Sequence, residues 1–370
     1  MKPLVGDHIE SLSPYVPGKP VEELERELGI EDPIKLASNE NPLGASPKAK
    51  EAIRTAAERA HIYPDGAAFY LKEDLAAAHD LGTDEIVVGN GSNEVLTLLV
   101  RTFTQPGHHN AVVSAHSFIA YRLILQAHGI NTRTVPMTDG LAFDLEAMSE
   151  AITDRTKIAF VANPNNPTGT YRSADQVRAF LERTPDDTIV VVDEAYHEYV
   201  QADDYASALT MRHLHPRLVV TRTFSKCYGL AGLRCGFGVM PSEMVDYVNR
   251  VREPFNSNLI AQHACREALG DTDFIERSVE TNEQGRAQLE SGLADMSDLG
   301  VDWIPSQTNF LLVELPTSGV EVFEAMQRRG VIIRPMAGYG LPEYVRITIG
   351  TQEQNRCCLE ALRETLEELV

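Results

Sequence analysis

Positive charge is scarce in this chain of 370 residues. Lys and Arg together number 33 against 54 Asp and Glu, which gives a formal net charge of −21. Nucleic acids and anionic membranes are bound by basic protein surfaces, so we expect neither as a partner. An anionic ligand must instead be drawn in by local arginines, against the overall field of the protein.

Cysteines, long apolar runs and several catalytic motifs are also scarce or missing. The five cysteines are odd in number and show no metal-ligand spacing, so we expect reduced thiols in a cytoplasmic protein. No run approaches about 18 apolar residues and no apolar signal region opens the chain, so we expect neither export nor a membrane span. HExxH, paired CxxC and GxSxG are missing, and HLHP (213–216) has no third ligand. Zinc-site and serine-hydrolase functions are therefore unsupported, and we expect no metal.

Lysine is so rare that its last occurrence stands out. The chain has eight lysines, and only Lys226 lies beyond Lys157. Most lysines lie on protein surfaces, but Lys226 follows the apolar, β-branched run 218–221, which predicts a short buried strand. This position suits an amine whose pKa must fall to make it nucleophilic. Thr223, Ser225 and Arg234 nearby supply what a phosphate monoester needs. An amine beside a phosphate site is the requirement of pyridoxal 5'-phosphate, which is held as a Schiff base on a lysine.

The order of apolar segments predicts an α/β fold. Strand-like runs at 85–89, 111–118, 131–137, 157–162, 188–192 and 218–221 alternate with helical patterns such as 93–103 and 174–183. Repeated strand–crossover–strand units form a mostly parallel sheet with helices on both faces. We therefore expect a large domain of this kind.

After Met240 the pattern changes. Helical sequence continues to about residue 297, and shorter strand-like pieces follow at 309–315, 331–336 and 345–350 before a C-terminal helix. We expect a second, smaller α/β domain over 246–370. The large domain then covers 36–245, and residues 1–35 form an N-terminal arm that belongs to the small domain.

Polar or aromatic residues follow several of the predicted strands, at the edge where ligands gather in parallel sheets. They are Gly91, Phe118, Asn166, Asp193 and Lys226. Asp193 ends a wholly apolar strand, where a carboxylate is costly unless it is paired. The protonated ring nitrogen of pyridoxal phosphate is a suitable partner, whereas a turn or helix-capping role is the alternative. Asn166 and Tyr196 can reach the ring oxygen, or can serve as a turn former and a packing residue.

Further candidates come from loops and strand pieces. GNGSNE (89–94) fails as a dinucleotide motif because Glu94 replaces its third glycine, but backbone amides around Ser92 and Asn93 can hold a single phosphate. The remaining candidates are an aromatic in the opening arm, a loop amide, a tyrosine presented by a turn, and two arginines in or after apolar strand pieces: Tyr15, Asn39, Tyr63, Arg334 and Arg346.

Taken together, these motifs resemble a known family. SNENP, YPDG, NPNNPTG, DEAY, TFSKCYGLAGLRCGF and VRITIG stand here in the order found in fold-type-I pyridoxal-phosphate aminotransferases. The resemblance covers essentially the whole chain and is strongest to the histidinol-phosphate aminotransferases of histidine biosynthesis.

The resemblance implies a role for most of the candidates. Lys226 would carry the cofactor and then move the proton during transamination, and Asp193 would pair with the pyridinium nitrogen. Asn166 and Tyr196 would contact the ring oxygen. Phe118 stands where the family usually stacks a tyrosine on the ring, and Asn93 replaces an acid of the glycine loop. The phosphate would be held by Ser92, Asn93, Thr223, Ser225 and Arg234. Tyr63 would reach into the neighbouring subunit's site, which implies a homodimer.

The substrate is less narrowly implied. Arg346 resembles the arginine that binds a substrate carboxylate across the superfamily. In the histidinol-phosphate enzymes, it and the residue matching Arg334 take the substrate phosphate. With Tyr15 and Asn39 as further substrate-binding candidates, this pattern favours exchange between L-histidinol phosphate and 2-oxoglutarate, giving imidazole acetol phosphate and L-glutamate. An aromatic aminotransferase, a pyridoxal-phosphate-dependent phospho-amino-acid decarboxylase and a non-enzymatic regulatory domain are the alternatives, the last disfavoured because the acidic chain has no room for a DNA-binding module.

Overall fold

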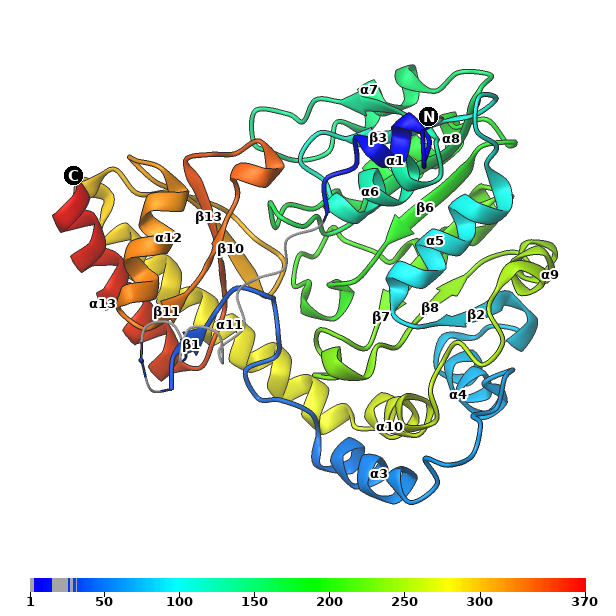
Figure 1. Cartoon of the computed structure of the whole chain (residues 1–370), viewed down its shortest axis with the longest axis horizontal. Coiled ribbons are helices and arrows are strands. Elements are labelled where there is room, and N and C mark those ends of the chain that lie inside the picture. The colour runs from blue at the N-terminus through cyan, green and yellow to red at the C-terminus, as the bar shows by residue number, and fades with distance from the viewer. Residues whose placement is uncertain (1–2, 15–25, 27–28, 31) are drawn as a thin grey trace.

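The computed structural model of the chain describes residues 3–14, 26, 29–30 and 32–370. A seven-stranded sheet fills the centre of the larger part (Figure 1), in the order β2-β8-β7-β6-β5-β3-β4. Its strands are β2 (Ile86–Gly89), β3 (Asn110–Ser114), β4 (Asn131–Val135), β5 (Thr156–Ala162), β6 (Ile189–Asp193), β7 (Leu218–Thr223) and β8 (Gly236–Val239). Strands β4, β3, β5, β6 and β7 pair in parallel, and β8 is antiparallel to both neighbours. The predicted α/β fold with a mostly parallel sheet is confirmed.

The central strands are apolar because helices cover both faces of the sheet. Every residue of β6 and β7 is buried. Helix α5 packs against α6 and α9, and α7 packs against α8. These helices are α5 (Ser92–Phe103), α6 (Ile119–Ala127), α7 (Leu145–Ala151), α8 (Ala174–Arg183) and α9 (Ser242–Val251). Helices α3 (Pro47–Ala57), α4 (Phe69–His79) and α10 (Leu259–Leu269) form a further layer beside β2 and β8.

Strand β8 is the one strand of this sheet that the sequence pattern does not indicate. Two of its four residues are glycines, which weaken a strand because they offer no side chain to pack. Here the glycines permit close contact. A Cβ at Gly236 would lie 2.3 Å from the backbone nitrogen of Ser92, and one at Gly238 would lie 2.6 Å from Val95. The N-terminus of α5 therefore rests directly on β8.

The smaller part has a sheet and a core of its own. Its antiparallel strands follow the order β12-β13-β10-β9, with β9 (Asp302–Ile304), β10 (Phe310–Glu314), β12 (Arg334–Pro335) and β13 (Tyr344–Thr348). Helices α11 (Thr272–Ala294), α12 (Gly319–Arg328) and α13 (Gln352–Leu369) pack on it. Strand β1 (Ile34–Lys35) pairs in parallel with β11 (Val331–Ile332), so the C-terminal end of the arm joins this part, whereas residues Asp7–Glu10 contact α6 of the larger part. The domain boundaries drawn from the sequence stay a prediction.

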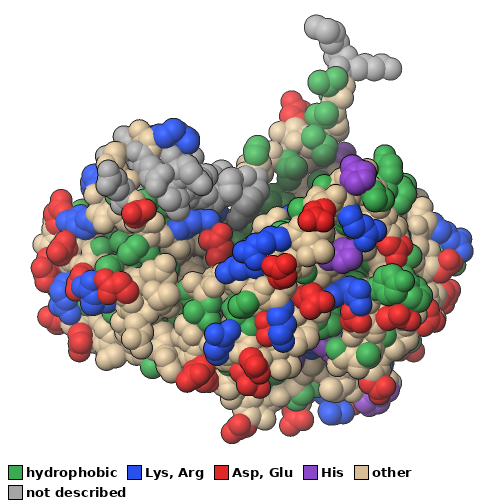
Figure 2. Space-filling view, turned by 90° about the horizontal axis from the view of Figure 1, so that it is seen from below, with side chains coloured by type: hydrophobic (Ala, Val, Ile, Leu, Met, Phe, Trp, Pro, Cys, Tyr) green, Lys and Arg blue, Asp and Glu red, His purple; other side chains and the backbone are tan. Residues whose placement is uncertain are grey.

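The short elements complete the described chain. They are α1 (Asp7–Glu10) and the 3-10 turns η1 (Thr83–Glu85), η2 (His197–Tyr199), η3 (Ala208–Leu214), η4 (Ala231–Leu233), η5 (Ser297–Leu299) and η6 (Ala337–Tyr339). In the part of the chain that the structure describes, no helix combines the length and apolar character that a bilayer crossing requires. On the face shown in Figure 2, acidic side chains are spread over the surface with basic ones among them.

A buried ion pair links the ends of β6 and β7. The Arg222 guanidinium donates through Nε (3.0 Å) and Nη2 (2.8 Å) to Glu194 Oε2, and both side chains are almost fully buried. Glu194 also accepts from the Ser207 hydroxyl at 2.7 Å and from the Ala208 amide at 2.6 Å. Because Glu194 follows Asp193 and Arg222 precedes Thr223, this pair fixes the two strand ends that carry the candidate site.

Replacing Arg222 by Met is expected to lower the free energy of unfolding by about 3–5 kcal/mol, because Glu194 would remain buried without its ion-pair partner. Chemical denaturation of the single variants and of Arg222→Met/Glu194→Gln measures the effect as a double-mutant cycle. The double variant should recover a large part of the loss. A double variant as unstable as the sum of both single variants would contradict this coupling.

Candidate active site

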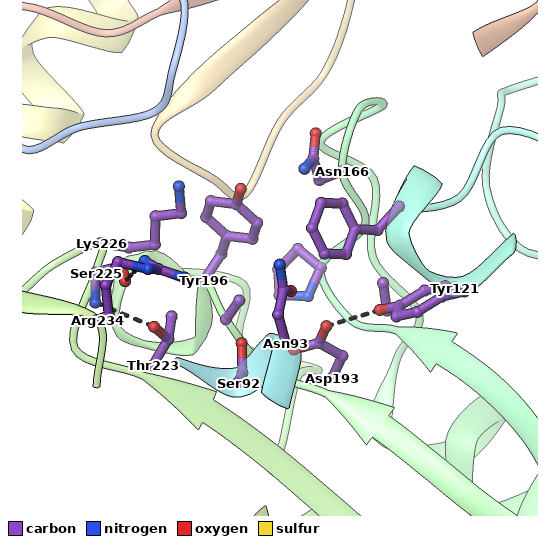
Figure 3. Close-up of a pocket in the computed structure, with 14 residues that line it drawn as sticks. Ser92, Asn93, Tyr121, Asn166, Asp193, Tyr196, Thr223, Ser225, Lys226 and Arg234 are labelled. Carbon is purple, nitrogen blue, oxygen red and sulfur yellow. Dashed lines mark hydrogen bonds between the residues drawn. The ribbon is translucent and has the colours of Figure 1, made fainter. Parts of the chain in front are cut away.

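A cavity opens at the carboxyl ends of β6 and β7 (Figure 3). It brings together ten of the residues predicted from the sequence, which come from six separate chain segments: Ser92, Asn93, Phe118, Asn166, Asp193, Tyr196, Thr223, Ser225, Lys226 and Arg234. The cavity is thus at the edge where a parallel sheet collects its ligand-binding residues.

Lys226 reaches into this cavity from the turn after β7. Its Nζ donates to the carbonyl oxygen of Ser38 at 3.2 Å and lies 5.7 Å from the centre of the Tyr196 ring. Burial, followed by the positive charge of Arg346, lowers the pKa of Lys226 to about 7. A large fraction of this amine is therefore neutral at neutral pH, which is the form that attacks a carbonyl carbon.

Asp193 lies at the base of the cavity with its two carboxylate oxygens in different surroundings. Oδ2 accepts a hydrogen bond from the Tyr121 hydroxyl at 2.7 Å. Oδ1 is buried and has no hydrogen-bond partner among the described residues. Burial raises the pKa of Asp193, and that rise is opposed first by the Tyr121 hydrogen bond and then by the Thr221 side chain and the Ala195 backbone. An unpaired buried carboxylate oxygen is costly, so Oδ1 fits a ligand that brings a proton donor.

Hydrogen-bond donors converge at one end of the cavity. Arg234 Nη1 lies 3.4 Å from the Ser225 hydroxyl, and the Ser225 amide donates to Thr223 Oγ1 at 3.1 Å. Helix α5 starts at Ser92 with no side-chain cap, so its first amides point at the same region. Gly91 has a φ of 80°, and a Cβ there would lie 2.6 Å from the Arg234 guanidinium. This cradle of hydroxyls, a guanidinium and a helix N-terminus fits a phosphate group.

Tyr196 and Asn166 complete the wall of the cavity. Tyr196 Oη accepts a hydrogen bond from Asn39 Nδ2 at 2.9 Å, so its own proton remains available for a ligand oxygen. Asn39 was predicted as a substrate-binding residue. The structure places its side chain behind Tyr196, held also by Thr348, and not in the lining of the cavity. Asn166 Oδ1 accepts from Arg346 Nη1, which leaves the Asn166 amide group for a ligand.

The two predicted arginines come from neighbouring strands of the smaller part. Arg334 of β12 and Arg346 of β13 are directly opposite in an antiparallel pair. Directly opposite side chains share one face of the sheet, with Cβ atoms about 5 Å apart. Arg346 is buried and also donates to the carbonyl oxygen of Ala37 at 2.8 Å. Two cations side by side next to the cavity suit a ligand with more than one negative charge.

Like Asn39, Arg334 and Arg346, Tyr63 is not among the residues that line the cavity. Tyr63 is 77% exposed and stacks on Phe255, with ring centres 4.7 Å apart. Tyr15 lies outside the described residues.

The structure adds Tyr121, which sequence reasoning missed, together with Ala162, Pro164 and Ala195. Its only sequence signal is the three-residue spacing from Phe118, which places both rings on one side of a helix start.

Comparison with known proteins agrees with this geometry. The family model "Aminotransferase class I and II" matches residues 31–362. The chain belongs to this family. The histidinol-phosphate aminotransferase of Anaeromyxobacter sp. is 48% identical over 98% of this chain and 99% of its own length. Histidinol-phosphate aminotransferase 2 of Pseudomonas fluorescens is also 48% identical, over 97% and 96%.

Solved structures show the same likeness. Histidinol-phosphate aminotransferase from Sinorhizobium meliloti, in complex with pyridoxal-5'-phosphate, superposes with a TM-score of 0.88 at 28% identity and covers 99% of this chain and 98% of its own. Aspartate aminotransferase from Thermus thermophilus with maleate has a TM-score of 0.82 at 22% identity, covers 99% and 98%, and shares the fold. The predicted aminotransferase class, its fold and its pyridoxal-phosphate cofactor are confirmed. The unpaired Asp193 Oδ1, the donor cradle and the neutral amine fit that cofactor.

In the cofactor-free protein, we expect the acetylation rate of Lys226 to level off above pH 7. The neutral amine is the reactive form, and a pKa of about 7 makes it half-populated there. Brief treatment with acetic anhydride over a pH series, followed by peptide mass spectrometry, measures the rate, with Lys50 in the same digest as an exposed comparison. A Lys226 rate that climbs steadily through pH 9 would contradict a lowered pKa.

Proposed function

We propose that this protein is a pyridoxal-phosphate-dependent histidinol-phosphate aminotransferase that exchanges the amino group between L-histidinol phosphate and 2-oxoglutarate in the cytoplasm. The observation that carries the substrate assignment is the cross-strand pair of Arg334 and Arg346 beside the cavity, which suits a phosphate-bearing amine. Near-full-length identity to relatives of that name supports it.

Pyridoxal phosphate, when bound, supplies an aldehyde for amines and an electron-withdrawing ring that weakens bonds at the amine-bearing carbon. In this proposal, Asp193 Oδ1 holds the proton on the ring nitrogen. Asn166 and Tyr196 donate to the ring oxygen, and Thr223, Ser225, Arg234 and the first amides of α5 bind the cofactor phosphate. Phe118 covers one face of the ring and excludes water from it.

Lys226 does the proton transfer. With cofactor and substrate bound, the low pKa would leave Nζ neutral, so it would accept the proton of the substrate's amine-bearing carbon. The same Nζ, once protonated, would act as the acid that gives this proton back. Arg346 and Arg334 hold the substrate phosphate, and Arg346 holds the carboxylate of 2-oxoglutarate or glutamate in the other half-reaction.

The purified protein is expected to prefer histidinol phosphate to phenylalanine in kcat/KM, measured with 2-oxoglutarate as acceptor. In the same assay Arg334→Gln should lose roughly 10- to 100-fold of its kcat/KM for histidinol phosphate and less for glutamate, because one charge-assisted phosphate contact is removed. A preference for phenylalanine would select the aromatic aminotransferase. Release of carbon dioxide without glutamate formation would select the decarboxylase.

We also propose that the active unit is a homodimer with shared sites. Several large apolar side chains are exposed around Tyr63 and on α4: Ile62, Tyr63, Phe69, Tyr70 and Phe255. Exposed apolar clusters mark contact surfaces, and Tyr63 does not line the cavity of its own chain. A second copy would cover this surface and insert Tyr63 into its partner's site.

Mixing inactive Lys226→Ala and Tyr63→Ala proteins tests the shared site. When the two proteins pair at random, half of the dimers contain one copy of each. Such a dimer has one site with both residues and one site with neither, so the mixture should regain about a quarter of the native sites. Sedimentation equilibrium checks the dimer itself, and mixing Lys226→Ala with Asp193→Ala is the matched control, because both changes fall in the same site. Recovery no greater than in that control would argue against Tyr63 crossing between subunits.

A further inference from the structure

Below the cavity, one tyrosine contacts the carboxylate at its base. Tyr121, in the first turn of α6, donates its hydroxyl proton to Asp193 Oδ2 at 2.7 Å (Figure 3). The Tyr121 side chain is 0% exposed. Its ring stacks on Phe160 of β5, with centres 4.8 Å apart and planes 11° apart, and meets the edge of Phe118 at 5.6 Å. Contacts with the Phe160 and Phe118 rings therefore fix where the Tyr121 hydroxyl lies.

We propose that Tyr121 is a positioning residue that holds Asp193 ionised and turned so that Oδ1 faces the ring nitrogen of the cofactor. This inference rests on the proposed function and assigns a role to a residue that the sequence motifs do not contain.

The first argument concerns orientation. The terminal torsion of an aspartate is broad and nearly two-fold, so a carboxylate needs a partner to fix it. Tyr121 occupies Oδ2, and Oδ1 has no partner within the described residues. A buried acceptor without a donor is costly, which makes Oδ1 the oxygen that a protonated ring nitrogen would satisfy. The Tyr121 hydroxyl is thus the group that distinguishes the two carboxylate oxygens, and without it that distinction is lost.

The second argument concerns charge. Asp193 is buried, and the neighbouring Glu194 carboxylate adds to the rise in its pKa, although Glu194 is itself paired with Arg222. The hydrogen bond from Tyr121 acts in the opposite direction because it stabilises the charged form, and the Thr221 side chain and the Ala195 backbone add smaller contributions of the same sign. Tyr121 stays protonated as a donor, since burial first and then Asp193, with Tyr196 and Tyr339 nearby, raises its pKa well above its ordinary value. Removing the hydroxyl shifts Asp193 toward its neutral acid, which cannot hold a proton on the ring nitrogen.

The test is Tyr121→Phe, which keeps the ring and its stacking and removes only the hydroxyl. Tyr205→Phe is the matched control, because that hydroxyl also donates to a protein acceptor, the Asn163 carbonyl oxygen at 3.3 Å, and does not line the cavity. Each protein is reconstituted with pyridoxal phosphate labelled with ¹⁵N in the ring, and the ¹⁵N chemical shift is followed against pH. Equilibrium dialysis gives the apparent dissociation constant of the cofactor.

We expect the ring nitrogen of Tyr121→Phe to lose its proton at lower pH than in the unmodified protein and in Tyr205→Phe. The cofactor should bind roughly 10-fold or more weakly, as expected for the loss of a hydrogen bond to a charged group. In an Asp193→Asn background the same Tyr121→Phe change should leave the ¹⁵N titration where Asp193→Asn alone puts it, because no carboxylate remains to be oriented. This second comparison also stands if Tyr121→Phe alone fails to fold.

A ¹⁵N titration of Tyr121→Phe that overlays the unmodified protein would overturn the inference, as would an equal shift in Tyr205→Phe or a further shift in the Asp193→Asn background. These outcomes leave the aminotransferase assignment standing. An unmodified protein that takes up no pyridoxal phosphate would instead overturn the proposed function and this inference with it.

Discussion

Two ionisable groups lie at the carboxyl ends of adjacent parallel strands without forming an ion pair with each other. Lys226 Nζ is bonded to a backbone carbonyl and Asp193 Oδ2 to a tyrosine hydroxyl. Burial lowers the pKa of the amine and raises the pKa of the carboxyl, so the charged form of each group is disfavoured. A ligand that pairs with both groups would remove this cost. The surrounding fold holds both groups in the lining of one cavity.

The segment from Ala37 to Asn41 ties the two sheets to this cavity. The Ala37 carbonyl accepts from Arg346, the Ser38 carbonyl from Lys226, and the Asn39 amide donates to Tyr196. Asn41 then donates to the carbonyl oxygen of Cys227 at 2.7 Å and to the Ser278 hydroxyl at 2.9 Å. One short loop therefore contacts Lys226, Tyr196 and Arg346, which the proposed reaction uses. A displacement of this loop would change the hydrogen bonds of all three residues.

Much of the fold can be predicted from the sequence, because buried parallel strands have nearly continuous apolar sequences. IVVV (189–192) and LVV (218–220) are such runs, and the polar residues after them lie where the sheet geometry requires. The pattern fails at β8, where glycines serve a close backbone contact. It also fails at Tyr121, whose partner is 72 residues away and depends on how α6 docks. The register that places Arg334 opposite Arg346 depends on the turn between their strands, and Asn39 turns toward Tyr196 from a left-handed backbone at φ 56°.

Helix α11 crosses from one part of the molecule to the other (Figure 1). Its 23 residues make a rod about 35 Å long. It contacts η2 and Asn41 at one end, and β9 and α13 along the rest of its length. One continuous helix therefore connects the two parts of the molecule, instead of a flexible linker at this point. Any movement of the smaller part relative to the larger one must therefore bend this helix or shift its contacts with η2 or with β9 and α13.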